Sequence, residues 1–309
     1  MASEPILTAF ELPVAKRSLF WDSKVWFDYF ALTKPEVNFL IVVTTFAGFY
    51  LGHDSGWHDF PILRSINAVL GTLFVASGTG TLNQYIEQRF DAQMRRTARR
   101  PLAAGRLSPS AVLWFGIALS VLGTVYLAAV NLFACLLALG TLLSYLFLYT
   151  PLKRKSPVCT LVGAFSGAMP PLIGWAAASG RLSFGAWILY VLLFLWQFPH
   201  FMSIAWMYRD DYARAGYRVL PRDECARDRL VNWQTLLPLA LLVPVTLLAA
   251  LTSKTNAAYR LGAVLLGAGF LYYGAQFALR KSNASARQLL SASIIYLPSL
   301  FVLMILLRG

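Results

Sequence analysis

The sequence predicts an all-α integral membrane protein, built as a single domain of nine transmembrane helices. Hydrophobic residues make up 58% of the 309 residues and charged residues only 13%, whereas a soluble domain carries roughly 25% charged residues. Apolar stretches of about 20 residues, the length that crosses a bilayer as a helix, recur along the chain. Because the backbone in lipid must satisfy its own hydrogen bonds, these stretches are expected to be helical.

Nine segments are expected to span the membrane, preceded by a cytoplasmic segment over residues 1–30, so that residues 31–309 form the bundle. Pro35 could begin the first helix, since a proline there removes no donor that the helix needs. Small residues such as Gly163, Gly167 and Gly174 would let helices approach closely in lipid. The expected spans are 37–52, 64–88, 110–130, 132–150, 157–178, 184–207, 231–251, 258–279 and 288–307.

The basic residues alternate between the loops that join these spans. The N-terminal segment and the loops after the second, fourth, sixth and eighth spans hold 22 of the 27 lysines and arginines, and the opposite side holds 5. The positive-inside rule then places the N-terminus in the cytoplasm and the C-terminus outside. This topology accounts for the net charge of +13, so no nucleic-acid partner is expected.

The N-terminal segment and the cysteines bear on the membrane in which the protein resides. Glu4 and Glu11 precede any apolar run, which is unlike a cleaved signal peptide or an acid-poor transit peptide, and this favours a bacterial inner membrane over a mitochondrial one. Cys135, Cys159 and Cys225 have no paired spacing. We therefore expect no disulfide framework and no cysteine metal cluster.

A stripe of oxygen-bearing side chains lies near the end of the second span. Asn83, Glu87 and Asp91 are four residues apart, so they share one face of a helix. Acids inside a membrane helix mark function or pairing, and oxygen ligands suit Mg²⁺, which binds one or two carboxylates together with substrate phosphates. The alternative is a helix end that emerges into water and pairs with nearby arginines, and spacing alone leaves the two interpretations equal.

Basic residues in two of the cytoplasmic loops are candidates for binding phosphate. Arg96 and Arg100 are four apart, and guanidinium groups bind phosphate oxygens in a bidentate manner. Lys153, followed by Arg154, could meet a diphosphate as a point charge at the end of the fourth span. The alternative is that these residues only determine topology, which is the preferred interpretation for Arg95 and Arg99.

The sixth span carries a histidine within an apolar helix. His200 follows Pro199, and a membrane histidine is a functional candidate, although it could also bond a neighbouring helix or lie at the interface. Asp211 is eleven residues further, close to three helical turns, so the two would share a face. Asp210 would point about a quarter turn away, which favours Asp211 as the aspartate that faces the bundle.

The oxygen-bearing stripe, the two basic loops and the stretch from His200 to Asp211 all fall at the predicted cytoplasmic ends of spans two, four and six. Acids for a metal, cations for phosphate and an apolar bundle beneath them together fit an isoprenoid diphosphate, whose head is anionic and whose tail prefers lipid. An enzyme site at one membrane face is therefore expected.

The same segments resemble those of the UbiA-type membrane prenyltransferases, and within them the protohaem IX farnesyltransferase branch. The similarity covers residues 30–220 and is strong only when its motifs are taken together. Much of the superfamily has aspartate where this chain has Gln84 and Glu87, and its second acidic motif usually has more aspartates than this chain offers. The matching stretches are Leu32 to Glu36, Asn83 to Asp91, Met94 to Leu102, Gly105 to Pro109, Tyr149 to Arg154, Gly167 to Trp175, Trp196 to Phe201 and Asp211 to Gly216.

The resemblance implies a UbiA-type fold, with nine helices around a central cavity, and a farnesyl transfer from farnesyl diphosphate to a vinyl group of haem B. Haem O and diphosphate would be the products, within haem A and terminal oxidase cofactor biosynthesis. Haem A synthase and terminal oxidase assembly proteins are the implied partners. The implied sites are a Mg²⁺ and catalytic site at Asn83, Glu87, Asp91 and Asp211, a diphosphate site at Arg96, Arg100, Lys153 and Arg154, and a haem contact at His200.

Three other functions compete with this one. A sister prenyltransferase would use a quinone precursor or chlorophyllide as acceptor. A transporter would carry inverted repeats and polar groups near the midplane, and the polar clusters here lie at one face instead. A haem-binding assembly factor without catalysis would not need the acidic stripe.

Overall fold

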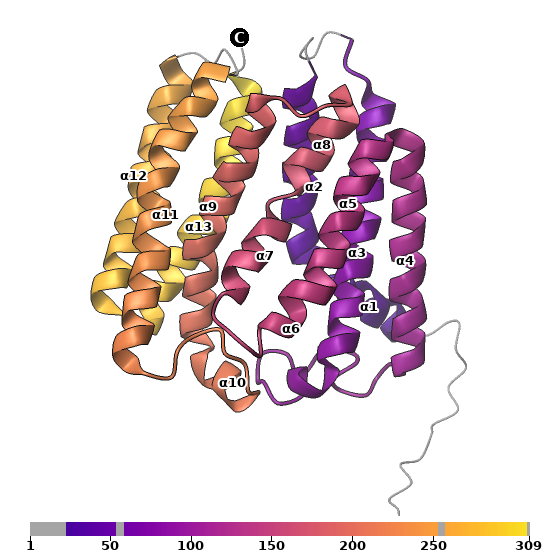
Figure 1. Cartoon of the computed structure of the whole chain (residues 1–309), viewed down its shortest axis with the longest axis vertical. Coiled ribbons are helices and arrows are strands. Elements are labelled where there is room, and N and C mark those ends of the chain that lie inside the picture. Colours follow the sequence, from indigo (N-terminus) through magenta and orange to yellow (C-terminus); the bar gives the residue numbers. More distant parts are fainter. Residues whose placement is uncertain (1–22, 54–58, 253–256, 308–309) are drawn as a thin grey trace, which may run out of the picture.

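The computed structural model describes residues 23–53, 59–252 and 257–307, and within these ranges the regular secondary structure is entirely helical. Nine helical segments of this part are long and apolar enough to cross a membrane, which confirms the predicted fold class (Figure 1). The helices are α1 Ser23–Leu32, α2 Pro35–Gly52, α3 Ile62–Asp91, α4 Pro109–Val130, α5 Leu132–Leu143, η1 Ser144–Tyr149, α6 Thr150–Leu152, α7 Cys159–Gly167, α8 Pro170–Ser179, α9 Phe184–Met207, α10 Arg209–Arg214, α11 Glu224–Thr252, α12 Ala257–Arg280 and α13 Asn283–Leu306.

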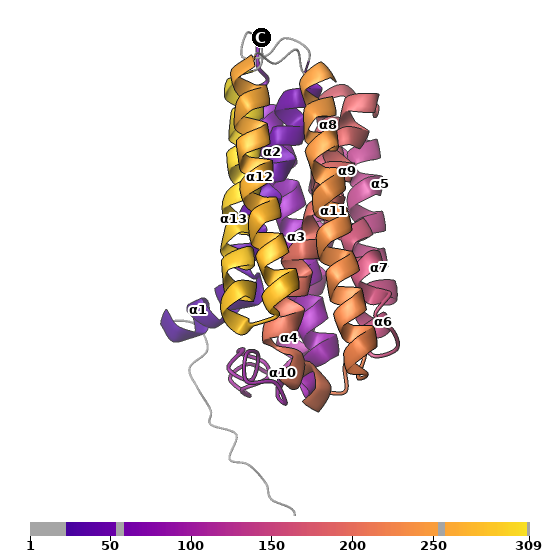
Figure 2. The same cartoon turned by 90° about the vertical axis from the view of Figure 1, so that its left-hand side faces the viewer.

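Most helix ends agree with the expected spans, and the largest difference is at α11. This helix begins at Glu224, and the predicted span began at residue 231. The first two turns of the helix are polar, so the hydropathy pattern did not include them in the span. Pro35 begins α2 as expected, while the short helix α1, which the sequence pattern did not predict, ends three residues before it. Figure 2 shows α1 beside the bundle instead of within it.

Prolines mark changes of helical form in two spans. The fifth span is interrupted and consists of α7 and α8, since Pro170 lacks the N–H that would continue α7 and its ring excludes the preceding turn. The fourth span stays helical to Leu152 but includes the π-helical turn η1, which ends two residues before Pro151. Wide turns of this kind are rare and occur mostly at functional sites, and here η1 faces the acidic end of α3.

The helices form a bundle, and α2 connects its two sides because it contacts both α8 and α13. Glycines allow the close approach of α2 and α8: a Cβ atom on Gly48 would overlap the backbone of Pro171, and one on Gly174 would overlap the backbone of Thr45. A Cβ on Gly163 would meet the Tyr149 ring, and one on Gly167 would meet Gln197. The expected packing role of the fifth-span glycines is confirmed.

Three polar connections lie together at one end of the bundle, which we call the polar end: residues 92–108, 153–158 and 208–223. The Arg218 N–H donates to the carbonyl of Lys153 at 2.8 Å, and the Arg214 side chain donates to the carbonyl of Gln93 at 3.4 Å. The loops that follow α3, α6 and α9 are therefore tied to one another.

Some predicted features lie outside the described residues. These are residues 1–22 of the N-terminal segment and two of the five basic residues assigned to the opposite side, Lys254 and Arg308. Two hollows on the described surface, of about 540 and 520 Å³, lie between α3 and α4 near Pro61 and between α12 and α13 near Ser299. Neither is lined by the acidic stripe, so the central cavity stays a prediction.

Candidate active site

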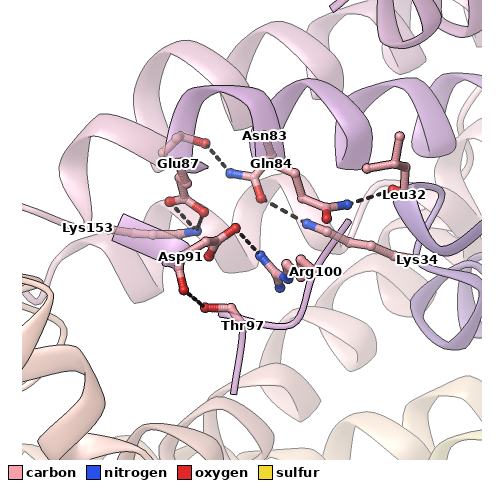
Figure 3. Close-up of polar contacts among 10 residues, drawn as sticks. Leu32, Lys34, Asn83, Gln84, Glu87, Asp91, Thr97, Arg100 and Lys153 are labelled. Carbon is pink, nitrogen blue, oxygen red and sulfur yellow. Dashed lines mark hydrogen bonds and ion pairs between the residues drawn. The ribbon is translucent and has the colours of Figure 1, made fainter. Parts of the chain in front are cut away.

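The last turns of α3 present the three predicted oxygen-bearing side chains on one buried face. Asn83, Glu87 and Asp91 are each at least 95% buried, and all three lie on the same side of the helix (Figure 3). The helical spacing therefore predicted their arrangement correctly. The neighbouring Gln84 turns its amide to the carbonyl of Leu32 at 2.8 Å and so anchors α3 to the end of α1.

Each member of this stripe is matched by a cation from a different part of the chain. Lys34 donates to the Asn83 amide oxygen at 2.9 Å, Lys153 bonds both Glu87 oxygens at 2.9 and 3.1 Å, and Arg100 pairs with Asp91 at 2.6 Å. Oxygen-bearing side chains and the cations paired with them therefore alternate along the last turns of α3. The structure brings together the predicted residues of the stripe with Arg100 and Lys153.

Lys34 was not predicted as a site residue. It precedes Pro35 and adopts a left-handed backbone with φ 56°, and strained conformations of non-glycine residues are concentrated at functional sites. Burial lowers the pKa of Lys34 to about 7, and the nearby charges of Arg100 and Lys153 contribute to the decrease. The one available signal was the Leu32–Glu36 motif, where a lysine directly precedes the first proline of a span.

Lys153 reaches the stripe because η1 and α6 turn the chain toward α3. Asn83 donates to the Thr150 hydroxyl at 3.2 Å, and the Lys153 ammonium lies 4.5 Å from the centre of the Tyr149 ring. Burial alone would lower the pKa of Lys153, but the Glu87 carboxylate outweighs it and raises this pKa well above its usual value. Lys153 is therefore a fixed positive charge beside the stripe.

The loop after α3 positions the two arginines differently. α3 ends at Asp91 and the chain continues in turns, so the spacing of four residues does not place Arg96 and Arg100 on one helix face. The Thr97 hydroxyl donates to the Asp91 carbonyl at 2.8 Å, which folds the loop back and delivers Arg100 to Asp91. The Arg96 guanidinium instead lies 5.2 Å from the centre of the Tyr208 ring.

Asp211 occupies a second carboxylate position at the polar end. It accepts from the Arg96 N–H at 3.4 Å and from Arg214 at 3.1 Å. The choice between the two aspartates is confirmed, since Asp211 is buried and the Asp210 side chain is 84% exposed. The shared helix face with His200 is wrong, however, because α9 ends at Met207 and α10 begins after a break at Tyr208.

The donor set of the α3 stripe fits Mg²⁺ that shares its coordination with a substrate. Mg²⁺ prefers oxygen ligands, keeps several waters, and is usually held by one or two carboxylates plus phosphate. Glu87, Asp91 and the Asn83 amide supply such ligands. Among the described residues no three His, Cys, Asp or Glu side chains are arranged to hold a metal. A cage made by the protein alone is therefore absent from this part of the chain, and the role of Asp211 as a fourth ligand stays a prediction.

Tyr217 is a second residue that the sequence did not single out. Gly216, with φ +74°, turns the chain, and the Tyr217 ring packs on Phe90 at 5.7 Å and on Tyr212 at 5.9 Å. Its hydroxyl is close enough to the Glu87 carboxylate to interact with it, but the contact lies outside the geometry of a regular hydrogen bond. Burial and the Glu87 charge raise the pKa of Tyr217, so the hydroxyl keeps its proton.

The remaining predicted residues lie at the margin of the stripe or away from it. Arg154 is exposed, and its guanidinium lies 4.4 Å from the centre of the Phe90 ring. His200 lies seven residues before the end of α9, about 10 Å deeper along the helix. There it contacts Ser293 of α13 and stacks on Trp196. The charged side chains therefore lie at one end of the bundle, and His200 lies within the bundle, away from them.

The comparisons with known proteins identify the family of the chain. The chain belongs to the UbiA prenyltransferase family, whose model matches residues 41–301, and the resemblance drawn from the motifs is confirmed. Within the family it is similar to the protoheme IX farnesyltransferase of Solibacter usitatus, with 46% identity over 288 residues that cover 90% of this chain and 98% of the relative.

Solved structures show the same fold. A digeranylgeranylglyceryl phosphate synthase has a TM-score of 0.73 at 16% identity, covering 92% of this chain and 99% of that one. A UbiA homologue from Archaeoglobus fulgidus, bound to GPP and Mg²⁺, has a TM-score of 0.62 at 16% identity, covering 90% and 99%. At this level of identity the likeness concerns the fold alone.

Proposed function

We propose that this protein transfers the farnesyl group of farnesyl diphosphate to a vinyl group of haem B, giving haem O and diphosphate. The observation that carries the proposal is the α3 stripe, where two buried carboxylates and an amide alternate with Lys34, Lys153 and Arg100 at one end of a membrane bundle. This set suits a multiply anionic head with its metal. The 46% identity to a protoheme IX farnesyltransferase selects the acceptor.

The polar end binds and activates the diphosphate in this proposal. Asn83, Glu87 and Asp91, with Asp211 from α10, would hold Mg²⁺, which when bound acts as a Lewis acid on the diphosphate oxygens. Arg96, Arg100, Lys153, Arg154 and Lys34 supply positive charge, and the Tyr217 hydroxyl supplies a neutral hydrogen-bond donor. Because negative charge builds up on the diphosphate as the farnesyl C–O bond breaks, these preorganised groups stabilise the transition state more than the ground state.

The acceptor half of the reaction requires an apolar surrounding. Diphosphate leaves with the electron pair of the C–O bond, the haem vinyl group forms the new C–C bond with the farnesyl carbon, and water adds to the resulting cation and loses a proton. Exclusion of water until the C–C bond has formed prevents loss of the farnesyl cation. The apolar bundle suits this requirement, since 72% of the most apolar part of α9 is buried.

His200 is the proposed contact to the haem. A neutral imidazole can ligate iron, and His200 lies within the bundle, seven residues before the end of α9. Replacement by alanine is expected to change the absorption spectrum of bound haem B. An unchanged spectrum and affinity would remove this assignment.

The proposal also includes an orientation and a location. Residues 31–309 act as one membrane domain, the polar end faces the cytoplasm, and the membrane is a bacterial inner membrane, where haem A synthase or terminal oxidase assembly would receive the product. Cys225 is exposed at the polar end, and Cys135 and Cys159 are buried. A membrane-impermeant maleimide should therefore label the protein in inverted vesicles and not in intact spheroplasts; the opposite pattern would reverse the orientation.

The function is tested by mass spectrometry of the haems extracted after purified protein is incubated with haem B, labelled farnesyl diphosphate and Mg²⁺. The expected product has the mass of haem B plus one farnesyl group and one hydroxyl group. Hydroxybenzoate and chlorophyllide are offered in parallel incubations. A farnesylated aromatic acid or chlorophyllide, with haem B unchanged, would assign the protein to a different acceptor.

A further inference from the structure

Ser293 of α13 contacts the ring of His200, which belongs to the neighbouring helix α9. Its hydroxyl oxygen lies 2.8 Å from His200 Nδ1, and its carbonyl accepts the indole N–H of Trp196 at 2.9 Å. Trp196 in turn stacks on the imidazole, with ring centres 4.7 Å apart and planes inclined by 23°. The imidazole is thereby fixed in orientation by one neighbour and bonded at one nitrogen by another.

The proton between Ser293 and His200 is assigned by the second bond that the serine makes. The Ser293 hydroxyl also lies 2.6 Å from the carbonyl oxygen of Leu290. A carbonyl only accepts, so the single hydroxyl proton is used in this bond. If the proton pointed to Nδ1 instead, two acceptor oxygens would face each other at 2.6 Å without a proton between them. Ser293 must therefore accept, and Nδ1 must carry the proton that it donates.

This assignment determines the state of the other ring nitrogen. In a neutral imidazole only one nitrogen bears a proton, so Nε2 carries a lone pair. Nε2 makes no hydrogen bond to any residue in the described ranges, and it is not among the fully enclosed unpartnered atoms there. His200 as a whole is only partly buried. An imidazole nitrogen with an unshared lone pair and no hydrogen-bond partner is the form in which histidine ligates iron.

We infer that Ser293 is a positioning residue that holds His200 as the Nδ1–H tautomer and thereby presents Nε2 as the ligand for the haem iron of the substrate. This inference rests on the proposed function, because it deepens the haem contact assigned to His200. An acceptor bonded to the distal N–H of a ligating histidine orients the ring and raises its basicity, and the loss of such a partner commonly reduces metal affinity or activity 10- to 100-fold.

The test compares Ser293→Ala with Ser203→Ala in the purified full-length protein. Ser203 is the matched control, because it is also fully buried and its hydroxyl donates to the backbone carbonyl of His200 at 2.7 Å without contact to the ring. Haem B is titrated by its absorption, and the iron–imidazole stretching frequency of the ferrous complex is measured by resonance Raman spectroscopy. Thermal unfolding is recorded for both variants.

We expect Ser293→Ala to weaken haem B binding about 10- to 100-fold and to lower the iron–imidazole frequency, since the ligand becomes less basic. Ser203→Ala should change neither, and the KM for farnesyl diphosphate should stay within about twofold in both variants, because the polar end is untouched. Ser293→Thr keeps an acceptor oxygen and should restore the frequency. A purely structural role for Ser293 would lower the unfolding temperature and leave the frequency unchanged.

A fourth variant, His200→Ala, separates failure of this inference from failure of the proposed function. If His200→Ala abolishes the iron–imidazole band while Ser293→Ala behaves like Ser203→Ala, His200 is a ligand and the role of Ser293 is overturned. If His200→Ala leaves the haem spectrum unchanged, the haem contact itself is wrong, and the inference is overturned with it.

Discussion

The end of α3 and the neighbourhood of His200 both contain polar groups within a membrane bundle, but these groups are stabilised in different ways. On α3, Glu87 and Asp91 carry charge, and each is matched by a cation from a separate loop. Around His200 the partners among the described residues are neutral: the hydroxyls of Ser293 and Ser203 and a stacked indole. A buried charge is costly unless it is paired, whereas a neutral imidazole needs only hydrogen bonds.

The difference indicates which region binds which part of the reaction. The α3 stripe is held together by opposite charges, so an incoming metal and diphosphate can replace one set of ion pairs by another without leaving a charge unpaired. The His200 region holds the ring by two contacts and leaves one ring nitrogen without a hydrogen bond to any described residue. Variants at the two regions should therefore separate the handling of diphosphate from the handling of haem.

The largest effect is expected from Asp91→Ala. Removing one carboxylate from the stripe should reduce farnesyl transfer by at least on the order of 10²–10³-fold, the size found when one preorganised electrostatic group is removed. The protein should still insert, and its affinity for haem B should be unchanged. Transfer is measured with labelled farnesyl diphosphate and haem B, and Asp210→Ala, at an exposed site, is the control. Turnover retained by Asp91→Ala in the presence of Mg²⁺ would contradict the metal role.

Lys153→Met should be the most destabilising change. It leaves Glu87 buried without its partner, which is expected to cost about 3–5 kcal/mol in the free energy of unfolding. Adding Glu87→Gln should recover most of this stability and none of the activity. Unfolding in one detergent is compared for the single and double variants, with the exposed Lys155→Met as control. A double variant as unstable as the single one would mean that the pair is not what stabilises this end.

Tyr217→Phe should have a smaller and more selective effect. A hydroxyl that is buried without a partner does not stabilise the free protein, so the unfolding temperature should be unchanged or higher. If the hydroxyl bonds the diphosphate, its loss should raise the KM for farnesyl diphosphate about tenfold, as for a hydrogen bond to a charged group. Tyr212→Phe, in the adjoining ring, is the control. An unchanged KM would exclude the contact.

The smallest effect is expected from Arg154→Ala. This arginine is exposed and stacks on Phe90, so its charge is screened by salt. The KM for farnesyl diphosphate should rise about two- to fivefold at low ionic strength and hardly at 0.5 M salt, in line with the small energies of exposed charges. An effect as large as that of Asp91→Ala, or one insensitive to salt, would place Arg154 within the site.

The sequence alone predicted the nine spans and the stripe, because both depend on local rules. Hydropathy over about 20 residues identifies a span, and a spacing of four residues places Asn83, Glu87 and Asp91 on one face wherever the chain is helical. The sequence also distinguished Asp211 from Asp210 correctly, although the continuous helix assumed for that choice is interrupted at Tyr208. Breaks of this kind depend on tertiary contacts that no local pattern records.

Only the tertiary structure decided which residues meet. Lys34, Lys153 and Arg100 come from segments up to 66 residues away from their partners on α3, and each could equally have been a topological charge on sequence grounds. Likewise, Ser293 is one of several serines in an apolar span, and its role depends on lying against His200, 93 residues earlier. The sequence determines where helices form and which face of each is polar, since these follow from neighbours along the chain. The pairing of those faces follows from packing between helices, which depends on the whole bundle.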